Sequence, residues 1–296
     1  MRRIVVLGST NTDMVISGKR IPVPGETVSG GRFLMNAGGK GANQAVAVAR
    51  LAAKRGACLF IAKVGDDVFG RATAARLKKD GIVAKLVVDK DEPSGTALIL
   101  VDAKGQNVIS VALGANGTLS PEDIARFRSD IEGASALLMQ LETPIETVLT
   151  AAQWAHAKGV PVILNPAPAA KLPRVLYGLL DWITPNETEA EVLTGVKVTD
   201  AASAARAAAV LKRRGVKNVL ITMGAKGCWC KGSLVPCRKV KAVDCVAAGD
   251  TFNGAFVAAL SEGRTVAEAI DFAQKACAIA VTRAGAQPSI PHRAEI

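Results

Sequence analysis

The most informative chemical feature of the sequence is an aspartate that directly follows a run of small residues. Residues 244–256 read DCVAAGDTFNGAF. After Asp250 the apolar residues recur at the spacing of an amphipathic helix, at Phe252, Ala255, Phe256, Ala259 and Leu260. The small residues 247–249 therefore lie at the N-terminus of the expected helix, where backbone N–H groups are free and the helix dipole adds positive potential.

This arrangement suits phosphoryl transfer. Asp250 could accept the proton of an attacking hydroxyl. The N–H groups of Ala247, Ala248 and Gly249 could stabilise the negative charge that develops on the transferring phosphoryl group. An aspartate at this point could also be the N-cap of the helix, with no chemical role. The residues alone leave both interpretations open.

A second feature is a glycine-rich loop at residues 36–45, which read NAGGKGANQA. Glycines allow the backbone to approach a ligand closely. Lys40 and Asn43 could donate hydrogen bonds to hydroxyls or phosphate. The loop does not have the Walker A spacing. A tight turn before a helix is the alternative interpretation.

The rest of the sequence predicts an α/β scaffold for these residues. Short apolar runs alternate with Ala-rich helical stretches, which is typical of a mostly parallel sheet covered by helices. We expect strands at residues 4–8, 59–62, 136–140, 160–164, 182–184 and 219–222. We expect helices at residues 41–54, 144–158 and 201–214.

Polar residues follow several of the expected strands. They include Asn11, Asp13, Glu142, Asn165 and Asn186. In an open α/β sheet the ligand lies beyond the carboxyl ends of the strands. We therefore expect these side chains to converge on one crevice.

Two segments interrupt the alternation of strands and helices. Residues 13–35 contain prolines and glycines between short β-prone pieces, and residues 95–111 have the pattern of a hairpin with its turn at 102–105. We expect one domain over residues 1–296, with a small β-sheet lid formed by residues of about 12–35 and 94–112.

Both motifs resemble signatures of the ribokinase family of sugar kinases, also called the phosphofructokinase-B family. Residues 244–256 resemble one signature, and the GGKGANQA string resembles the other. The strings MQLE, NPAPA, TPNETEAE and VTRAGAQPS extend the likeness over residues of about 4–295. The resemblance implies a ribokinase-like doubly wound, mostly parallel α/β sheet with a small β-sheet lid, and it favours Asp250 as a base.

The resemblance also implies the reaction and its sugar site. It implies that ATP phosphorylates D-ribose at the 5-hydroxyl, giving ribose 5-phosphate and ADP in D-ribose catabolism. The sugar site implied by the family consists of Asn11, Thr12, Asp13, Gly39, Lys40, Gly41, Ala42, Asn43, Glu142 and Asp250.

The family further implies a nucleotide site, two metal sites and a homodimer formed through the lids. The ATP site would contain Asn186, Thr222, Met223, Gly224, Ala225, Lys226, Gly227, Gly249 and Gln274. Asn186 and Glu189 would hold Mg²⁺ through water, although Asn-x-x-Glu before a helix is also a capping-box pattern. Potassium would be held by Asp244, Val246, Ala280, Arg283, Gly285 and Ser289. Cys245 and Gln274 depart from the common family residues, Thr and His.

The composition of the chain argues against several other classes of function. The formal net charge is +11, but the basic residues are scattered and aromatic residues are few. This pattern argues against a nucleic-acid groove, and a positive field would attract ATP. The six cysteines include no C-x-x-C pair, so we expect reduced thiols and a cytoplasmic location. We expect no membrane span.

Other functions stay open on the sequence. The first is the same chemistry on another substrate, such as 2-deoxyribose or a nucleoside. A second is a non-catalytic, sugar-binding regulator on the same fold, against which the intact Asp250 and its glycine turn argue. The third, suggested only by the charge, is nucleic-acid binding.

Overall fold

The computed structural model describes residues 2–296. In these residues a nine-stranded sheet forms the centre, in the order β13-β12-β11-β10-β9-β8-β1-β4-β5. The pairs from β11 to β5 are parallel, whereas β12 and β13 are antiparallel edge strands. The strands are β1 (Ile4–Leu7), β4 (Cys58–Gly65), β5 (Val83–Asp89), β8 (Ala136–Met139), β9 (Val162–Leu164), β10 (Trp182–Ile183), β11 (Asn218–Thr222), β12 (Cys228–Cys230) and β13 (Ser233–Val235).

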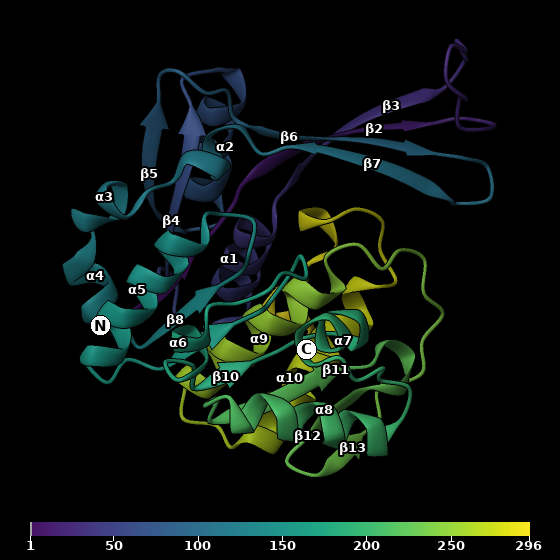
Figure 1. The fold of residues 1–296 in the computed structure, drawn as a ribbon. Helices are drawn as coiled ribbons and strands as arrows, with labels where there is room; N and C mark the ends of the chain where they lie inside the picture. The colour runs from purple at the N-terminus through teal and green to yellow at the C-terminus, as the bar shows by residue number, and fades with distance from the viewer. Residues whose placement is uncertain (1) are drawn as a thin grey trace.

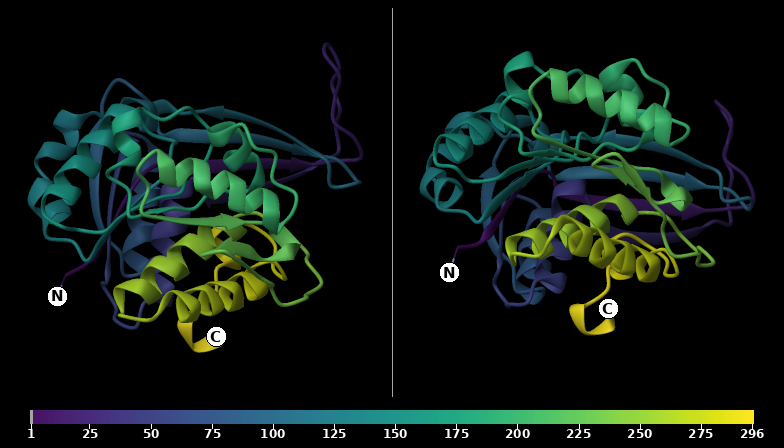
Figure 2. Two further views of the ribbon diagram at one scale, coloured as in Figure 1. Left: turned by 60° about the horizontal axis from the view of Figure 1, so that its bottom comes forward. Right: turned by 90° about the horizontal axis from the view of Figure 1, so that it is seen from below.

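Helices cover both faces of this sheet, so the doubly wound α/β fold predicted from the sequence is confirmed (Figure 2). One face packs against α5 (Ile145–Ala157), α7 (Glu187–Thr194) and α8 (Ala201–Arg213). The other packs against α1 (Lys40–Leu51), α9 (Ala248–Ser261) and α10 (Val266–Ala280). Neighbouring strand residues alternate between the two cores: Leu137 lies in the first and Leu138 in the second.

Shorter helices complete the body. They are α2 (Val68–Lys79), α3 (Pro121–Ala125), α4 (Arg128–Glu132) and α6 (Arg174–Tyr177), with 3-10 turns η1 (Gly114–Thr118), η2 (Gly224–Lys226), η3 (Gln287–Ser289) and η4 (Arg293–Glu295). No helix in the described part of the chain has the length and apolar character needed to cross a bilayer.

A second sheet projects from the body (Figure 1). We call it the lid sheet; its order is β3-β2-β6-β7. It consists of β2 (Asn11–Ser17), β3 (Arg32–Gly38), β6 (Gly95–Val101) and β7 (Asn107–Ala112). The expected hairpin of β6 and β7 is present, and its turn is closed by hydrogen bonds between Asp102 and both Gln106 and Gly105.

Close packing between α1 and α9 brings the two sequence motifs together. Gly254 in α9 faces the backbone of α1, where an added Cβ would lie 2.9 Å from the carbonyl oxygen of Gln44 and 3.0 Å from the amide of Val48. Only glycine permits so close an approach. The first turn of α9, which carries Asp250, therefore lies against the first turn of α1, which carries Asn43.

Candidate active site

Asp250 lies inside the first turn of α9 and is not its N-cap. The N-cap is Ala247, which has a positive φ of 58° and makes no side-chain cap. The Asp250 carboxylate instead accepts hydrogen bonds from Asn43 Nδ2 and Gln44 Nε2, each at 3.0 Å. The interpretation of Asp250 as a capping residue is therefore wrong, because its oxygens face α1.

The surroundings of Asp250 favour proton uptake. Its side chain is buried, and desolvation raises its pKa above the ordinary range. The positive charge of Lys40 and the amides of Asn43 and Gln44 oppose this rise, while the charge of Glu142 adds to it. A carboxylate with a raised pKa is a stronger base towards a hydroxyl.

The turn before Asp250 offers free backbone donors. We call residues 246–249 the anion turn. The N–H of Ala248 donates to the carbonyl of Cys245 at 3.2 Å. Those of Ala247 and Gly249 have no protein acceptor among residues 2–296. Two of the three predicted N–H donors are thus open to a ligand. Ala247 has a positive φ, and this backbone conformation stores strain of about 1–3 kcal/mol at the turn.

Two further carboxylates stand near Asp250. Glu142 accepts hydrogen bonds from Ser9 Oγ at 2.5 Å and from the Lys40 N–H at the start of α1 at 3.0 Å. Asp13 projects from β2, and burial, with the charges of Glu142 and Asp250, raises its pKa to about 6. Three acidic side chains therefore lie in one partly buried region. Without a ligand, their mutual repulsion and their loss of hydration destabilise the folded protein.

We expect Asp13→Asn to stabilise the protein at neutral pH. The pKa of Asp13 rises from 3.8 unfolded to about 6 folded, so its contribution to stability is complete below pH 3.8 and is lost as the pH rises to about 6. The variant should match the original near pH 4 and exceed its free energy of unfolding by about 3 kcal/mol above pH 6. Urea denaturation across this pH range measures the difference.

Asp66→Asn is the matched control for the Asp13 prediction. Asp66 is an exposed carboxylate paired with Arg71, and exposed pairs contribute little. Its replacement should change the free energy of unfolding by less than about 1 kcal/mol. If Asp13→Asn behaves like this control, the three-carboxylate account of the site is wrong.

Asn11 is held by a buried residue that the sequence analysis missed. Asn116 in η1 donates from Nδ2 to Asn11 Oδ1 at 2.8 Å, and its Oδ1 accepts the Thr10 N–H at 2.9 Å. Asn116 has no exposed surface. Nothing in its sequence context, GANGT, distinguishes it from an ordinary turn residue.

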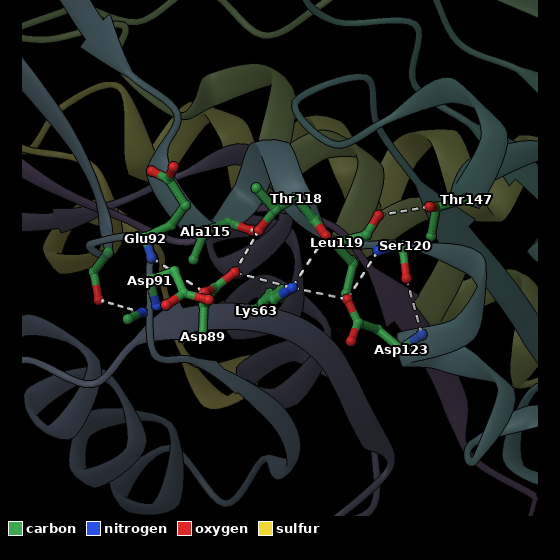
Figure 3. Close-up of polar contacts among 12 residues, drawn as sticks. Lys63, Asp89, Asp91, Glu92, Ala115, Thr118, Leu119, Ser120, Asp123 and Thr147 are labelled. Carbon is green, nitrogen blue, oxygen red and sulfur yellow. Dashed lines mark hydrogen bonds and ion pairs between the residues drawn. The ribbon is translucent and has the colours of Figure 1, made fainter.

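A cluster of ion pairs and hydrogen bonds outside the crevice holds η1 in place (Figure 3). Lys63 on β4 lies 3.0 Å from both Asp89 and Asp123, and its Nζ donates to the Thr118 carbonyl at 3.1 Å. Thr118 Oγ1 donates to Asp89 at 2.7 Å. The cluster anchors the end of η1 and thereby the position of Asn116.

The glycine-rich loop contains the remaining residues that are predicted to contact the sugar, except Thr12, which lies on β2. Gly39 has a φ of 87° and lies against the backbone of residues 10–11. Asn43 Oδ1 is buried without a hydrogen-bond partner among residues 2–296, so its capacity to accept a hydrogen bond is unused. Ala42 is buried with its N–H donated to Ser9, and the Thr12 side chain lies on the face of β2 opposite Asp13. Contacts from these two residues stay predictions.

Except for Gly249 and Gln274, the predicted nucleotide residues lie at the ends of β10 and β11. Thr222 forms a bridge to Asn186, and the N–H of Met223 donates to the Gly227 carbonyl at 2.8 Å. The Met223 side chain is in the core, and Lys226 Nζ donates to the Thr199 carbonyl at 2.8 Å. The Met223 carbonyl also accepts the Lys226 N–H at 3.0 Å, so both backbone groups of Met223 are already bound, and its contact with ATP stays a prediction. Exposed Gly224 and Ala225 leave their part of the turn open.

Gln274 lies in α10 beside this turn. Its Nε2 donates to the Val235 carbonyl at 3.2 Å, so the amide also holds β13 against the helix. A contact between Gln274 and adenine stays a prediction.

Asn186 and Glu189 form the capping box that their spacing permits. The Glu189 N–H donates to Asn186 Oδ1, and the Asn186 N–H donates to Glu189 Oε2, each at 2.8 Å. Glu189 is buried, and desolvation raises its pKa. The capping role is therefore present, and the magnesium role stays a prediction. No cluster of three or more His, Cys, Asp and Glu suited to a metal occurs within residues 2–296.

The predicted potassium residues come from the segment before α9 and from the end of α10 with the residues that follow it, and Asp244 joins these two parts. Its carboxylate accepts the N–H of Val246 at 2.9 Å and that of Gly285 at 2.8 Å. The carbonyl oxygens of Val246, Arg283, Gly285 and Ser289 accept no protein hydrogen bond among residues 2–296, whereas that of Ala280 accepts the Arg283 N–H at 3.0 Å. Free carbonyls beside a carboxylate form a donor set that fits a hard cation.

A buried carboxylate beside open backbone donors, at the carboxyl ends of a doubly wound sheet and next to a small lid sheet, is the arrangement expected of a small-molecule kinase. Comparison with known proteins identifies the family within this class. The chain matches the pfkB family carbohydrate kinase over residues 1–293, so it belongs to that family.

Individual relatives agree with this membership. The chain is 46% identical to a ribokinase of Haemophilus influenzae, over 99% of this chain and 97% of the relative. It is 39% identical to a deoxyribokinase of Salmonella typhimurium, over 97% of this chain and 95% of the relative. A solved structure of Arabidopsis thaliana ribokinase complexed with ribose and ATP superposes with a TM-score of 0.91, at 33% identity, over 99% of this chain and 97% of that one.

Proposed function

We propose that this protein phosphorylates D-ribose at its 5-hydroxyl with ATP, releasing ribose 5-phosphate and ADP. The observation that carries the proposal is the buried Asp250 carboxylate, held by two amides of α1 beside the open anion turn. The likeness to ribokinases over nearly the full chain supports ribose as the sugar. The body and the lid sheet act together as one catalytic domain.

Each group has a distinct role in this reaction. Asp250 takes the proton of the 5-hydroxyl as its oxygen attacks the terminal phosphorus of ATP, and the bond from that phosphorus to the bridging oxygen of ADP breaks. The N–H groups of Ala247 and Gly249 stabilise the charge on the transferring oxygens. Asn11, Asp13 and Asn43 bind the other hydroxyls and orient the ring.

The test is ADP production from ATP and Mg²⁺ with D-ribose, 2-deoxyribose, fructose and adenosine. We expect ribose to give the highest kcat/KM. Preference for 2-deoxyribose, the substrate that the name of the Salmonella relative indicates, would replace the sugar and keep the chemistry. If no substrate is phosphorylated but ribose binds, the protein is a sugar-binding regulator.

Magnesium belongs to the same proposal. Asn186 and Glu189 would hold it through water, because both Glu189 oxygens are already bound by Asn186. Mg²⁺ commonly keeps several waters and few protein ligands. When bound, the ion neutralises part of the charge on the ATP phosphates.

Potassium activation is the next expectation. The carbonyls beside Asp244 lie next to the anion turn, where a bound cation adds positive potential. Asp244→Asn removes the only carboxylate of the predicted set and should abolish most of the potassium response of kcat. A potassium titration at constant ionic strength, with choline as the replacement ion, measures it. An undiminished response in Asp244→Asn would place the activating ion elsewhere.

We also propose a homodimer formed through the lid sheets. Five apolar side chains on the face opposite Asp13 are about half exposed: Ile16, Phe33, Met35, Leu98 and Val108. An exposed apolar sheet face of this kind marks an interface. Sedimentation of the protein should give a dimer, and Phe33→Glu should give a monomer.

A further inference from the structure

We propose that Gln44 is the positioning residue of the base: its buried side-chain amide fixes the Asp250 carboxylate and links it, through a buried network of hydrogen bonds, to Gly249 of the anion turn. This inference rests on the proposed function, because it takes Asp250 as the group that accepts the hydroxyl proton.

The Gln44 amide makes hydrogen bonds to three neighbours. Nε2 donates to Asp250 Oδ1 and to Asn165 Oδ1, each at 3.0 Å. Oε1 accepts from Gln140 Nε2 at 2.6 Å. Gln44 has no exposed surface, so water cannot replace these partners, and losing one leaves a buried polar group unpaired.

The neighbours permit only one orientation of this amide. The Thr184 backbone carbonyl accepts from Asn165 Nδ2 at 3.0 Å, which turns Asn165 Oδ1 towards Gln44. An ionised Asp250 also offers only acceptors. A reversed Gln44 amide would place Oε1 against both oxygens and Nε2 against the donor of Gln140. The donor that reaches the base is thus set by a backbone carbonyl, which cannot reverse.

The same set of hydrogen bonds returns to α9 on the other side of Asp250. Thr184 Oγ1 donates to Asn253 Oδ1 at 2.6 Å, and Asn253 Nδ2 donates to the Gly249 carbonyl at 2.8 Å. The carboxylate of the base and the last residue of the anion turn are therefore held by one buried network. A shift of either would break bonds throughout it.

Gln44 differs from the titratable groups that face Asp250. These come from α1, β2, the segment after β8, α7 and α10, and they are Lys40, Asp13, Glu142, Glu189 and Cys277. Gln44 is neutral at every pH, so replacing it alters proton uptake by Asp250 without adding or removing a titrating group. Its donor favours the ionised carboxylate and lowers the Asp250 pKa, against the effect of burial.

The decisive variant is Gln44→Met, which keeps the side-chain length and removes the donor. We expect the acid limb of the pH profile of kcat for ribose to move upward by about one to two pH units, the effect of losing one hydrogen bond to a charged group. The KM for ribose should change less than kcat, because the sugar contacts stay in place. Gln44→Asn, whose amide is one methylene too short to reach Asp250, is the second variant and should shift the limb in the same direction.

Thr147→Val is the matched control. Thr147 in α5 is fully buried, and its Oγ1 donates to the Leu119 carbonyl at 2.6 Å. This variant loses one buried hydrogen bond away from Asp250, so it should lower stability and leave the pH profile unchanged. An unchanged limb in both folded Gln44 variants, or an equal shift in Thr147→Val, would overturn the inference.

A measurement that does not depend on catalytic turnover separates this inference from the proposed function. Titration of the Asp250 carboxyl by carbon-13 NMR, assigned with Asp250→Asn, should give a higher pKa in Gln44→Met than in the original protein. If the original protein forms no ADP with any sugar, the proposed reaction fails, while this titration still decides the role of Gln44. An unchanged Asp250 pKa would refute that role even in an active kinase.

Discussion

Asp250→Asn is expected to lower kcat for ribose phosphorylation by on the order of 10²–10⁴-fold, the usual contribution of a general base. The amide has the same shape but cannot accept the hydroxyl proton. Ribose affinity should change little, because the other groups predicted to bind the sugar hydroxyls stay in place. Single-turnover kinetics and ribose titration calorimetry measure the two effects separately.

The fold should tolerate this substitution. The Asn oxygen can accept from Asn43 or Gln44, but its NH₂ then faces the other donor. That loss is offset because a buried charge is removed. Asp200→Asn is the matched control: Asp200 caps α8 away from the site, and asparagine is an equally good N-cap. Near-normal turnover in Asp250→Asn would refute the role of Asp250.

The sequence predicted the parts of the fold that have strong periodicity. The continuous apolar run of β4 and the Ala-rich helix α8 lie within three residues of their expected bounds. Strand β5 was missed because its seven residues, VAKLVVD, mix charged and apolar types. The edge strands β12 and β13 have three residues each, too few for a pattern.

The candidate site was predictable where one motif carries it and not where distant segments meet. The helix pattern after Asp250 indicated that it lies at a helix start, but not that α1 supplies its partners. Gln44 belongs to the glycine-rich motif found in the sequence, but its hydrogen bond to Asn165 joins residues that are 121 positions apart. Such a contact depends on the order of the strands, which no local pattern contains.

Gly39→Ala is the second large expected effect. Gly39 has a φ of 87°, and an added Cβ would lie 2.7 Å from the amide nitrogen of Asn11 and 2.7 Å from the Cα of Thr10. Backbone strain and overpacking together should lower the free energy of unfolding by about 2–6 kcal/mol. Because β2 must move away, Asn11 and Asp13 are displaced, and kcat/KM for ribose should fall by about 10²-fold. Urea denaturation and initial rates measure both.

Gly56→Ala is the control that separates the effect of the strained backbone angle from the effect of the close contact with β2. Gly56 has a similar φ of 76°, but no atom lies within 4 Å of its added Cβ. This variant should lose only about 1–2 kcal/mol of stability and keep its kcat/KM, because β1 and β2 stay in place. Equal losses in both variants would mean that the unusual backbone angle alone explains Gly39. A loss of kcat/KM confined to Gly39→Ala would mean that the contact between this loop and β2 positions the sugar-binding residues.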